Sequence, residues 1–486
     1  MRGYGRAPCG SRGAPSGTVV RMRWFDAPGY WLGRLLFQHV LAVVYAVGFL
    51  AAARQGRALI GEHGLLPVPR HLARTTAREA PSVFRLHYSD RFFAALAWGG
   101  VLLAAALAAG AGDLVPLWGS MLLWAALWAA YLSIVNVGQI WYSFGWESLL
   151  LETGALAVFL GNADTAPPWP VLLLVRWVLF RVEVGSGLIK LRGDRCWRDL
   201  TCLYYHHETQ PMPGPLSWWF HRLPRPLHRV EAAANHVVQL GAPVVLFLPQ
   251  PAATAAAGLV VVTQLWLLLS GNFAWLNWLT VTLALSAVST GSHRAYPATP
   301  GWFTGCALAY TAVVLLLSHR PARNLLSHRQ LMNRSFDSLH LVNTYGAFGS
   351  ITRLRHEVVI EGSDDGRTWL PYEFKGKPGD PRRLPRQWAP YHLRLDWLMW
   401  FAALNAGYAR PWMTPLLRKL LAGDRDTLRL LRGNPFPDRP PAQVRAMRYR
   451  YRFTTRDERR ADGAWWHREL VGGYHRPLSG PAGSDG

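Results

Sequence analysis

AAANHVVQLGAPVVLFLPQPAATAAAGLVVVTQLWLLLSGNFAWLNWLTVTLALSAVSTGSH, residues 232–293, is the stretch that decides the fold, because it contains no Asp, Glu, Lys or Arg. Residues 114–146 also lack all four. Water-soluble chains rarely do this, whereas one helical crossing of a bilayer needs about 20 apolar residues. The first stretch has room for three crossings, with breaks at 248–251 and 271–272. The sequence therefore predicts a polytopic membrane protein.

Further apolar segments extend this membrane region in both directions. They are residues 31–53, 92–111, 147–160, 169–190 and 302–318. On the length criterion the total is about seven to nine spans. We expect a multi-span domain over residues 28–320, after a basic tail over residues 1–27 that the positive-inside rule keeps in the cytoplasm.

The chain is strongly basic, but its basicity is a weak guide to function. Lys and Arg number 52 against 29 Asp and Glu, a net charge of +23, and only four of the 52 are Lys. An arginine bias of this kind suggests GC-rich coding and a bacterial source. No recognition helix or aromatic RNA-binding motif accompanies the arginines, so we expect no nucleic-acid partner. The phosphate-loop, dinucleotide, HExxH and GxSxG motifs are also missing from the sequence.

After about residue 321 the pattern changes to short alternating runs, which predicts a C-terminal α+β domain with a β-sheet over residues 321–476. Residues 356–361 and 369–374 read as a hairpin around the turn sequence at 363–366. Residues 447–453 alternate aromatic with Arg, as in a half-buried strand.

Helices are predicted over 393–404 and 413–431, and the proline-rich residues 434–441 predict an ordered loop. We expect residues 477–486 to be a disordered tail.

Ionisable side chains on apolar segments are the first candidates for function, because such groups at membrane depth usually face a cavity or one another. Arg181, Glu183 and Lys190 lie near the end of one apolar helix. They either line a functional cavity, or Arg181 pairs with Glu183 while Lys190 extends to the interface. Glu147 and Glu152 are either a proton-handling pair or interhelical hydrogen-bonding groups.

Two cysteines, Cys196 and Cys202, lie close together in the loop that follows. They form a disulfide if the loop brings their Cα atoms within about 7 Å and the compartment is oxidising. Free buried thiols and a metal site shared with His206 and His207 remain alternatives, although the spacing matches no standard zinc pattern. Exchange with a redox partner is a further alternative. The sequence by itself indicates no cofactor and no particular metal.

Five segments are distinctive enough to be compared with known families: residues 187–224 (GLIKLRGDRCWRDLTCLYYHHETQPMPGPLSWWFHRLP), 139–159, 341–361, 372–400 and 428–440. Through these segments the sequence resembles the lipase maturation factor family over most of its length. It implies a membrane protein whose vertebrate members reside in the endoplasmic reticulum. Those members, usually drawn with five spans, have a cytosolic N-terminus and a lumenal C-terminal domain and help homodimeric lipases of the lipoprotein lipase group to fold.

The resemblance also implies a site and partners. The site lies in the loop over residues 191–231, and its candidate residues are Arg192, Asp194, Trp197, Asp199, His206 and Glu208, with a redox role for Cys196 and Cys202. The implied partners are the lipid bilayer, an exported client such as a lipase, and a thiol-disulfide oxidoreductase. The membrane is the cytoplasmic one in a bacterium and the endoplasmic reticulum in a eukaryote. A chaperone-like α+β domain holding a client gives four contact candidates, Trp397, Trp400, Asn343 and Tyr345, although the tryptophans also suit a core.

A second hypothesis is that the protein is an enzyme. Residues 187–191, followed by Trp197, resemble the membrane region of vitamin K-dependent carboxylases. That resemblance implies that Lys190 acts as a base on a lipid-like or quinone substrate. We expect a maturation factor that is not an enzyme and keep the carboxylase-like enzyme as the alternative.

Overall fold

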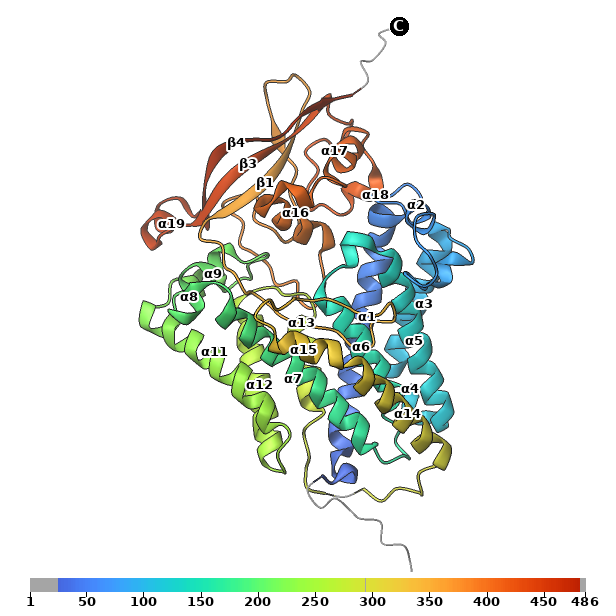
Figure 1. Cartoon of the computed structure of the whole chain (residues 1–486). Coiled ribbons are helices and arrows are strands. Elements are labelled where there is room, and N and C mark those ends of the chain that lie inside the picture. The colour runs from blue at the N-terminus through green and yellow to red at the C-terminus, as the bar shows by residue number, and fades with distance from the viewer. Residues whose placement is uncertain (1–24, 293, 481–486) are drawn as a thin grey trace, which may run out of the picture.

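The computed structural model describes residues 25–292 and 294–480. Helices from the first two thirds of the chain form a bundle, and a small sheet with its own helices lies at one end of that bundle (Figure 1). Most of the predicted basic tail and residues 481–486 fall outside the described residues.

Five helical segments among the described residues are long and apolar enough to cross a bilayer. They are Ala27–Ile60, which includes α1 (Trp31–Ile60), then α3 (Asp90–Ala108), α5 (Leu117–Val137), α12 (Ala252–Ser270), and Gly301–Leu326, which comprises α14 (Gly301–Leu317) and α15 (His319–Leu326). The expected helical membrane domain is therefore present.

The predicted count of seven to nine spans is not confirmed. Helices α6 (Gly145–Ala157) and α13 (Leu276–Leu285) have only 13 and 10 residues, and α7 (Trp169–Arg192) and α11 (Arg225–Val245) contain several charged residues. Every residue of α6 is buried. A short helix such as α6 is apolar because it packs against other helices of the protein. Its hydropathy alone therefore does not indicate contact with lipid.

The breaks predicted in the charge-free stretch are confirmed. Helix α11 ends at Val245 and α12 begins at Ala252, after the two prolines of residues 249–251; α12 ends at Ser270 and α13 begins at Leu276. Proline has no N–H to donate, so a helix does not continue through such a pair.

Short helices lie at the ends of the bundle. They are η1 (Ala27–Tyr30), α2 (Val68–Leu72), η2 (Val83–Arg85), α4 (Ala111–Leu114), η3 (Gln139–Tyr142), α8 (Arg195–Arg198), α9 (Leu203–Thr209) and α10 (Ser217–His221). The last three follow α7 directly and belong to residues 187–224, which we call the signature segment.

The C-terminal sheet has four antiparallel strands in the order β2-β1-β3-β4. The strands are β1 (Arg355–Ser363), β2 (Leu370–Pro371), β3 (Gln443–Phe453) and β4 (Trp466–Ser479). The predicted hairpin is confirmed, with Glu361 opposite Pro371, but its second strand is short. The prediction of a disordered tail from residue 477 is wrong for residues 477–479, because β4 pairs with β3 as far as Ser479.

Strand β3 is confirmed, but its buried face changes along the strand. Tyr451 and Phe453 are buried at one end, whereas Val444 and Ala446 are buried at the other. The two ends of the strand pack into different hydrophobic clusters: Val444 and Ala446 belong to the main core, whereas Tyr451 and Phe453 pack with Trp218 and Trp466.

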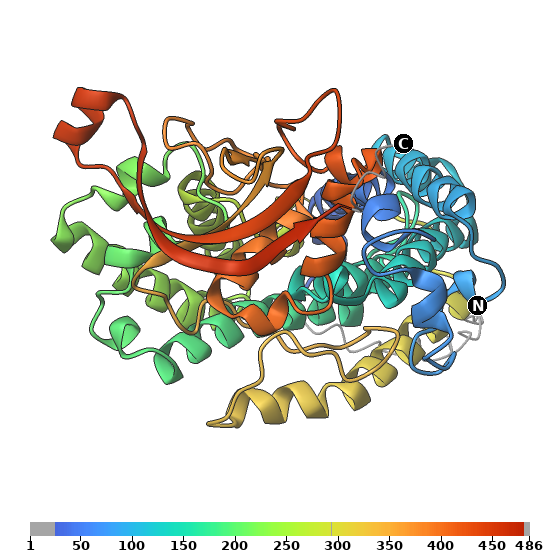
Figure 2. The same ribbon diagram turned by 90° about the horizontal axis from the view of Figure 1, so that it is seen from above.

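Helices cover the sheet on the side facing the bundle (Figures 1 and 2). They are α16 (Arg394–Leu404), which packs on β1, and α17 (Met413–Leu421), which packs on β3 and β4. The short helix η4 (Ala406–Tyr408) follows α16, α18 (Arg425–Leu428) lies against α1 and α17, and α19 (Arg456–Asp462) connects β3 to β4. The helices predicted over 393–404 and 413–431 are confirmed. The proline-rich loop is held to the sheet by Phe436, which packs near Tyr372 and over Gly362.

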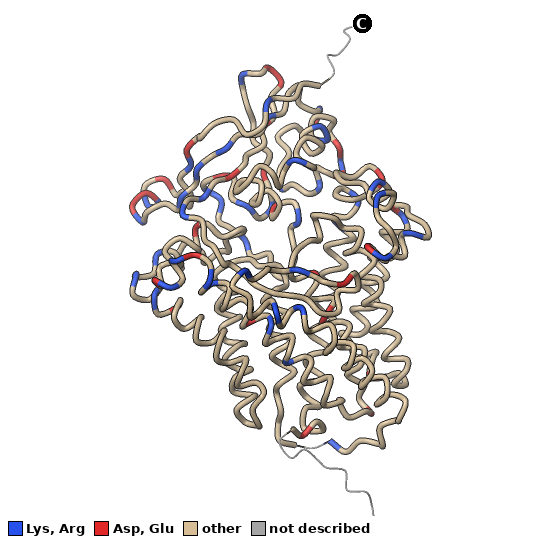
Figure 3. The backbone as a smooth tube through the Cα atoms, in the orientation of Figure 1, with Lys and Arg blue, Asp and Glu red and all other residues tan. Residues whose placement is uncertain are grey.

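Charged residues are concentrated in the half of the molecule that contains the sheet, and the far half of the bundle has few (Figure 3). The first described residues lie at the far end of the bundle from the sheet (Figure 1). With the half of the bundle that has few charged residues placed in a membrane, the start of α1 and the C-terminal domain lie on opposite sides of that membrane.

Candidate functional site

The signature segment leaves the membrane helices through a tight contact at Gly193. A side chain at this position would place its Cβ 2.1 Å from the carbonyl oxygen of Gly349. The next residue, Asp194, donates its backbone N–H to the same oxygen at 2.8 Å, and its carboxylate accepts from Cys196 N at 3.1 Å and from Arg353 Nη2 at 2.9 Å. These charged hydrogen bonds, led by the one from Arg353, lower the pKa of Asp194. The start of the signature segment is thereby fixed to residues 349–353.

The two cysteines of the signature segment are joined in the structure. Cys196 and Cys202 form a disulfide with a Cα–Cα distance of 4.8 Å, which is within the range a disulfide needs. Their sulfur atoms are bonded to each other and cannot act as thiolate ligands, so the alternative of a metal held by these cysteines with His206 and His207 does not fit. The next side chain, Trp197, donates its indole N–H to Phe348 O at 2.7 Å. The buried ring of His206 packs against Phe348.

Three other predicted residues of the signature segment have different surroundings. Arg192 donates to Leu325 O at 2.8 Å and thus holds α15 against α7. Asp199 forms an exposed ion pair with Arg195. Glu208 accepts the backbone N–H of Phe453 at 2.7 Å, which joins α9 to the end of β3. Burial raises the pKa of Glu208.

Arg355, which the sequence analysis missed, holds the end of α9 onto the sheet. Its guanidinium donates to the carbonyl oxygens of Glu208, Gln210 and Pro211 at 2.9, 2.5 and 3.1 Å. It also donates to Glu357 Oε1 at 2.5 Å, and Lys377 Nζ lies 2.9 Å from Glu357 Oε2. All three charged side chains are buried. A planar guanidinium suits several oxygens at once, so one arginine fixes the shape of this turn.

Glu147 is the first of two buried carboxylates that fasten the membrane helices to the C-terminal domain. Arg394 Nη1 of α16 donates to Glu147 Oε1 and to Trp141 O, both at 2.7 Å. Tyr131 donates its hydroxyl to the other carboxylate oxygen at 2.6 Å. Arg394 and Glu147 are fully buried, so this contact forms part of the interior.

Glu152 makes the second connection, between α6, α7 and residues 343–345. It accepts from Arg181, from the backbone and side-chain nitrogens of Asn343 at 3.0 and 2.9 Å, and from the hydroxyl of Tyr345 at 2.6 Å. The alternative that pairs Arg181 with Glu183 is therefore wrong, because a carboxylate on a neighbouring helix takes the guanidinium. Glu147 and Glu152 have separate partners and do not form a pair.

The remaining intramembrane candidates are held by amide groups. Glu183 accepts from Gln264 Nε2 at 2.8 Å. Lys190 donates to Asn235 Oδ1 and Gln239 Oε1 at 2.8 and 2.9 Å and is only 5% exposed. The alternative that Lys190 extends to the interface is thus wrong, because two amide oxygens of α11 satisfy its ammonium group inside the protein.

The four candidates for client contact are interior residues. Trp397, Asn343 and Tyr345 are buried, and Trp400 is half-buried and donates its indole N–H to Thr209 O at 3.1 Å. A client cannot reach three of them in this conformation, so their positions do not support that prediction. They pack the C-terminal domain against the bundle instead.

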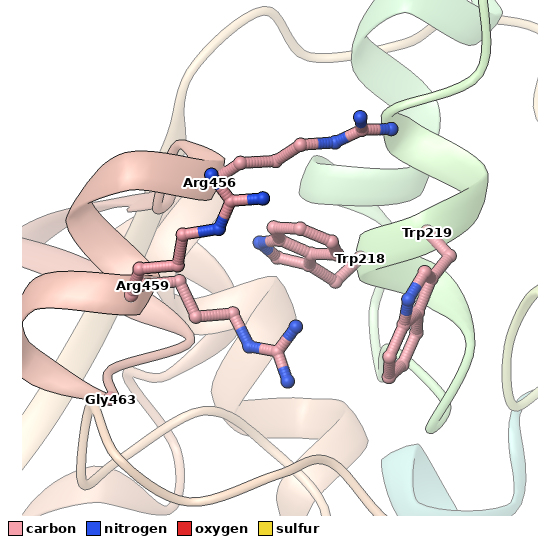
Figure 4. Close-up of a pocket in the computed structure, with 6 residues that line it drawn as sticks. Trp218, Trp219, Arg456, Arg459 and Gly463 are labelled. Atoms are coloured by element: carbon pink, nitrogen blue, oxygen red, sulfur yellow. The ribbon is translucent and has the colours of Figure 1, made fainter.

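An exposed hollow lies where the signature segment meets the C-terminal domain. It has a volume of about 540 Å³ and is lined by Trp218, Trp219, Arg456, Arg459, Arg460 and Gly463. Arginine side chains of α19 extend toward the two tryptophans of α10 (Figure 4). The Arg459 guanidinium carbon lies 3.6 Å from the ring centroid of Trp465 and 5.0 Å from that of Trp218. This cation–aromatic surface suits an anionic or aromatic group of a partner.

These features define a class of protein. It is a helical membrane protein whose C-terminal α+β domain is fastened to the membrane bundle by buried ion pairs and by a disulfide-containing segment. The family profile of the lipase maturation factor transmembrane domain matches residues 32–295, and that of the lipase maturation factor C-terminal domain matches residues 341–476. The chain belongs to the lipase maturation factor family.

Similar proteins cover nearly the whole chain. Lipase maturation factor 1 of Bos taurus is 41% identical over 97% of this chain and 93% of the relative, and that of Homo sapiens is 40% identical over 97% and 91%. Lipase maturation factor 2 of Rattus norvegicus is 29% identical over 90% and 81%. No solved structure matches the chain.

Proposed function

We propose that this protein is a membrane-bound maturation factor that assists the folding and assembly of a secreted lipase or a similar exported client. The names of the relatives support the lipase as client class. The proposed site of action is the side of the membrane that carries the C-terminal domain, either outside the cytoplasmic membrane or inside the endoplasmic reticulum.

One observation carries this proposal. The signature segment and the C-terminal domain form one unit, in which Arg355 and Glu208 join α9 to the sheet. At the edge of this unit, the exposed ring of Trp219 and the half-buried guanidinium of Arg459 line the hollow and offer an aromatic and cationic surface. A partly folded client exposes aromatic side chains and unpaired charges, and aromatic and Arg residues are the types that most often carry binding energy at protein interfaces.

The disulfide also supports a site of action on the side of the membrane that carries the C-terminal domain. A disulfide persists in an oxidising compartment, which is where a secreted lipase folds. We propose that Cys196 and Cys202 are oxidised in the working protein and stabilise the signature segment. Their burial supports a structural bond over one that exchanges with a thiol-disulfide oxidoreductase.

The enzyme alternative is not favoured by the surroundings of Lys190. A base needs a free lone pair, whereas Lys190 donates to two amide oxygens and lies 4.9 Å from the Trp197 ring centroid. The amine is therefore held by the protein's own side chains on α11 and α8.

The test measures maturation of a co-expressed secreted homodimeric lipase in cells that lack a maturation factor of their own. The readout is lipase activity in the medium per amount of lipase protein. Wild-type chain should raise this ratio, and Trp219→Ala with Arg459→Ala should lower it toward the level without the chain. Tyr408→Ala with Arg418→Ala is the matched control, because it removes an exposed aromatic and an exposed arginine elsewhere on the domain. Equal ratios with and without wild-type chain would refute the proposal for this client class, and equal loss in both double variants would refute the role of the hollow.

A further inference from the structure

Three potential metal-binding side chains meet between α9 and α11, apart from the disulfide and the hollow. They are His207 of α9 and His228 and Glu231 of α11. One ligand atom from each lies within 4.8 Å of the other two. His207 is 1% exposed and His228 is 2% exposed.

Most of the hydrogen-bonding atoms of this cluster lack a partner among the described residues. Both ring nitrogens of His207 and of His228 lack a hydrogen-bond partner among the residues that the structure describes, and so does Glu231 Oε2. Buried polar atoms in native proteins nearly always have partners, so five unpartnered atoms in one place require an explanation. A cation bound between them supplies one.

The ligand types match zinc. Zinc binds imidazole nitrogen and carboxylate oxygen, and two His with one Glu and an open fourth position is an established set. Calcium and magnesium prefer oxygen ligands, so they do not suit two imidazoles. Imidazole binds a metal ion through the lone pair of a ring nitrogen, and the ring nitrogens of His207 and His228 are buried without hydrogen-bond partners among the described residues.

The ligand atoms lie within 4.8 Å of one another and must move closer together to bind one ion. His228 and Glu231 are three residues apart on one face of α11, with 3.9 Å between Nδ1 and Oε2. Ligand atoms around a tetrahedral zinc with bonds of about 2.1 Å lie about 3.4 Å apart. Trp266 donates its indole N–H to Glu231 Oε1 at 2.8 Å, which leaves Oε2 for the metal and orients the carboxylate.

We propose that His207, His228 and Glu231 bind one zinc ion, which pins the signature segment to α11. The ion joins a helix that follows Cys202 directly to the helix whose Asn235 and Gln239 hold Lys190. Metal and disulfide then act on the same short segment from its two ends.

The test uses the full-length protein purified in detergent. After loading with zinc and dialysis, elemental analysis should find about one zinc per wild-type chain. His228→Gln and Glu231→Gln should lose it, whereas His236→Gln, on the same helix but outside the cluster, should retain it. Trp266→Phe keeps the ring that packs on Phe220 but removes the hydrogen bond to Glu231, so it should weaken zinc affinity about 10- to 100-fold.

Two results would overturn the proposal. One is wild-type chain that retains no stoichiometric zinc, and the other is retention in His228→Gln and Glu231→Gln equal to that in wild type. If those two variants aggregate, wild-type protein loaded with cobalt decides. A visible absorption band of tetrahedral cobalt that zinc abolishes supports the site, and a spectrum of octahedral aqueous cobalt alone refutes it.

Discussion

Replacing Arg394 by Met tests whether the buried pair with Glu147 fastens the C-terminal domain to the membrane bundle. The substitution removes the donor to Glu147 Oε1 and to Trp141 O. It leaves the hydroxyl of Tyr131 on the other carboxylate oxygen and the neutral His392 ring, whose Nδ1 lies 3.6 Å from Oε1. Both charged groups are fully buried. Removing one partner of such a pair leaves an uncompensated buried charge and costs about 3–5 kcal/mol.

Hydrogen exchange of the α16 amides measures this cost, because local opening sets their exchange rate. A loss of about 3–5 kcal/mol corresponds to exchange about 100- to 4,000-fold faster than in wild type. Arg418→Met, at an exposed position of α17, is the matched control and should change stability by less than about 0.5 kcal/mol.

The second half of the test is the double variant Arg394→Met with Glu147→Gln. The neutral amide no longer leaves a buried charge, so α16 should exchange about 10-fold more slowly than in Arg394→Met alone. The reasoning is refuted if Arg394→Met exchanges no faster than Arg418→Met, or if Glu147→Gln makes the Arg394→Met protein still less stable.

Three further predictions concern the signature segment and α19. Gly193→Ala should lower the thermal midpoint in detergent by the equivalent of about 1–3 kcal/mol, because the added Cβ would meet Gly349 O. Gly241→Ala is the control and should not lower it, because the space around Gly241 is open. Equal effects of the two substitutions would contradict the close contact at Gly193. Replacing Cys196 and Cys202 by Ser should cost about 2 kcal/mol of unfolding free energy, and mass spectrometry of unreduced wild type that finds both thiols alkylated would refute the bond. Hydrogen bonds from Arg452 and Thr455 lower the pKa of Glu458 to about 2, so its contribution to stability is present above the unfolded pKa near 4.5 and is lost as the pH falls toward 2. Glu458→Gln should therefore lower the thermal midpoint at pH 7 more than at pH 2, and a constant difference would count against that linkage.

The sequence was informative wherever a local pattern has one physical solution. A charge-free stretch broken by Pro249 and Pro251 predicts apolar helices and their ends, and both are present. Alternation predicted β3, but the bulges of β4 opposite Val444 to Tyr449 depend on the pairing of the two strands and leave no local pattern. Hydropathy also cannot separate α6, which is buried by other parts of the protein, from α12, which is only 33% buried and lies at the surface of the bundle.

Some candidate functional residues could likewise be recognised from the local sequence, whereas their partners could not. Glu147, Glu152 and Arg181 were identifiable because they interrupt apolar helices, but their partners Arg394 and Asn343 lie far along the chain. Arg355 gave no sign of its role, since its ligands are backbone carbonyls of another segment. His228 and Glu231 offered a signal, two potential ligands one helical turn apart, but His207 joins them only through the packing of α9 on α11.

The central claim is that the signature segment and the C-terminal domain form one extracytoplasmic unit on the side of the membrane opposite the start of α1. Reporter fusions at the C-terminus, active on only one side of the membrane, test it directly. The account predicts activity of the reporter that works outside the cytoplasm and none of the cytoplasmic one. A cytoplasmic C-terminus would contradict it, because the disulfide would then face a reducing compartment and an exported lipase could not reach the domain.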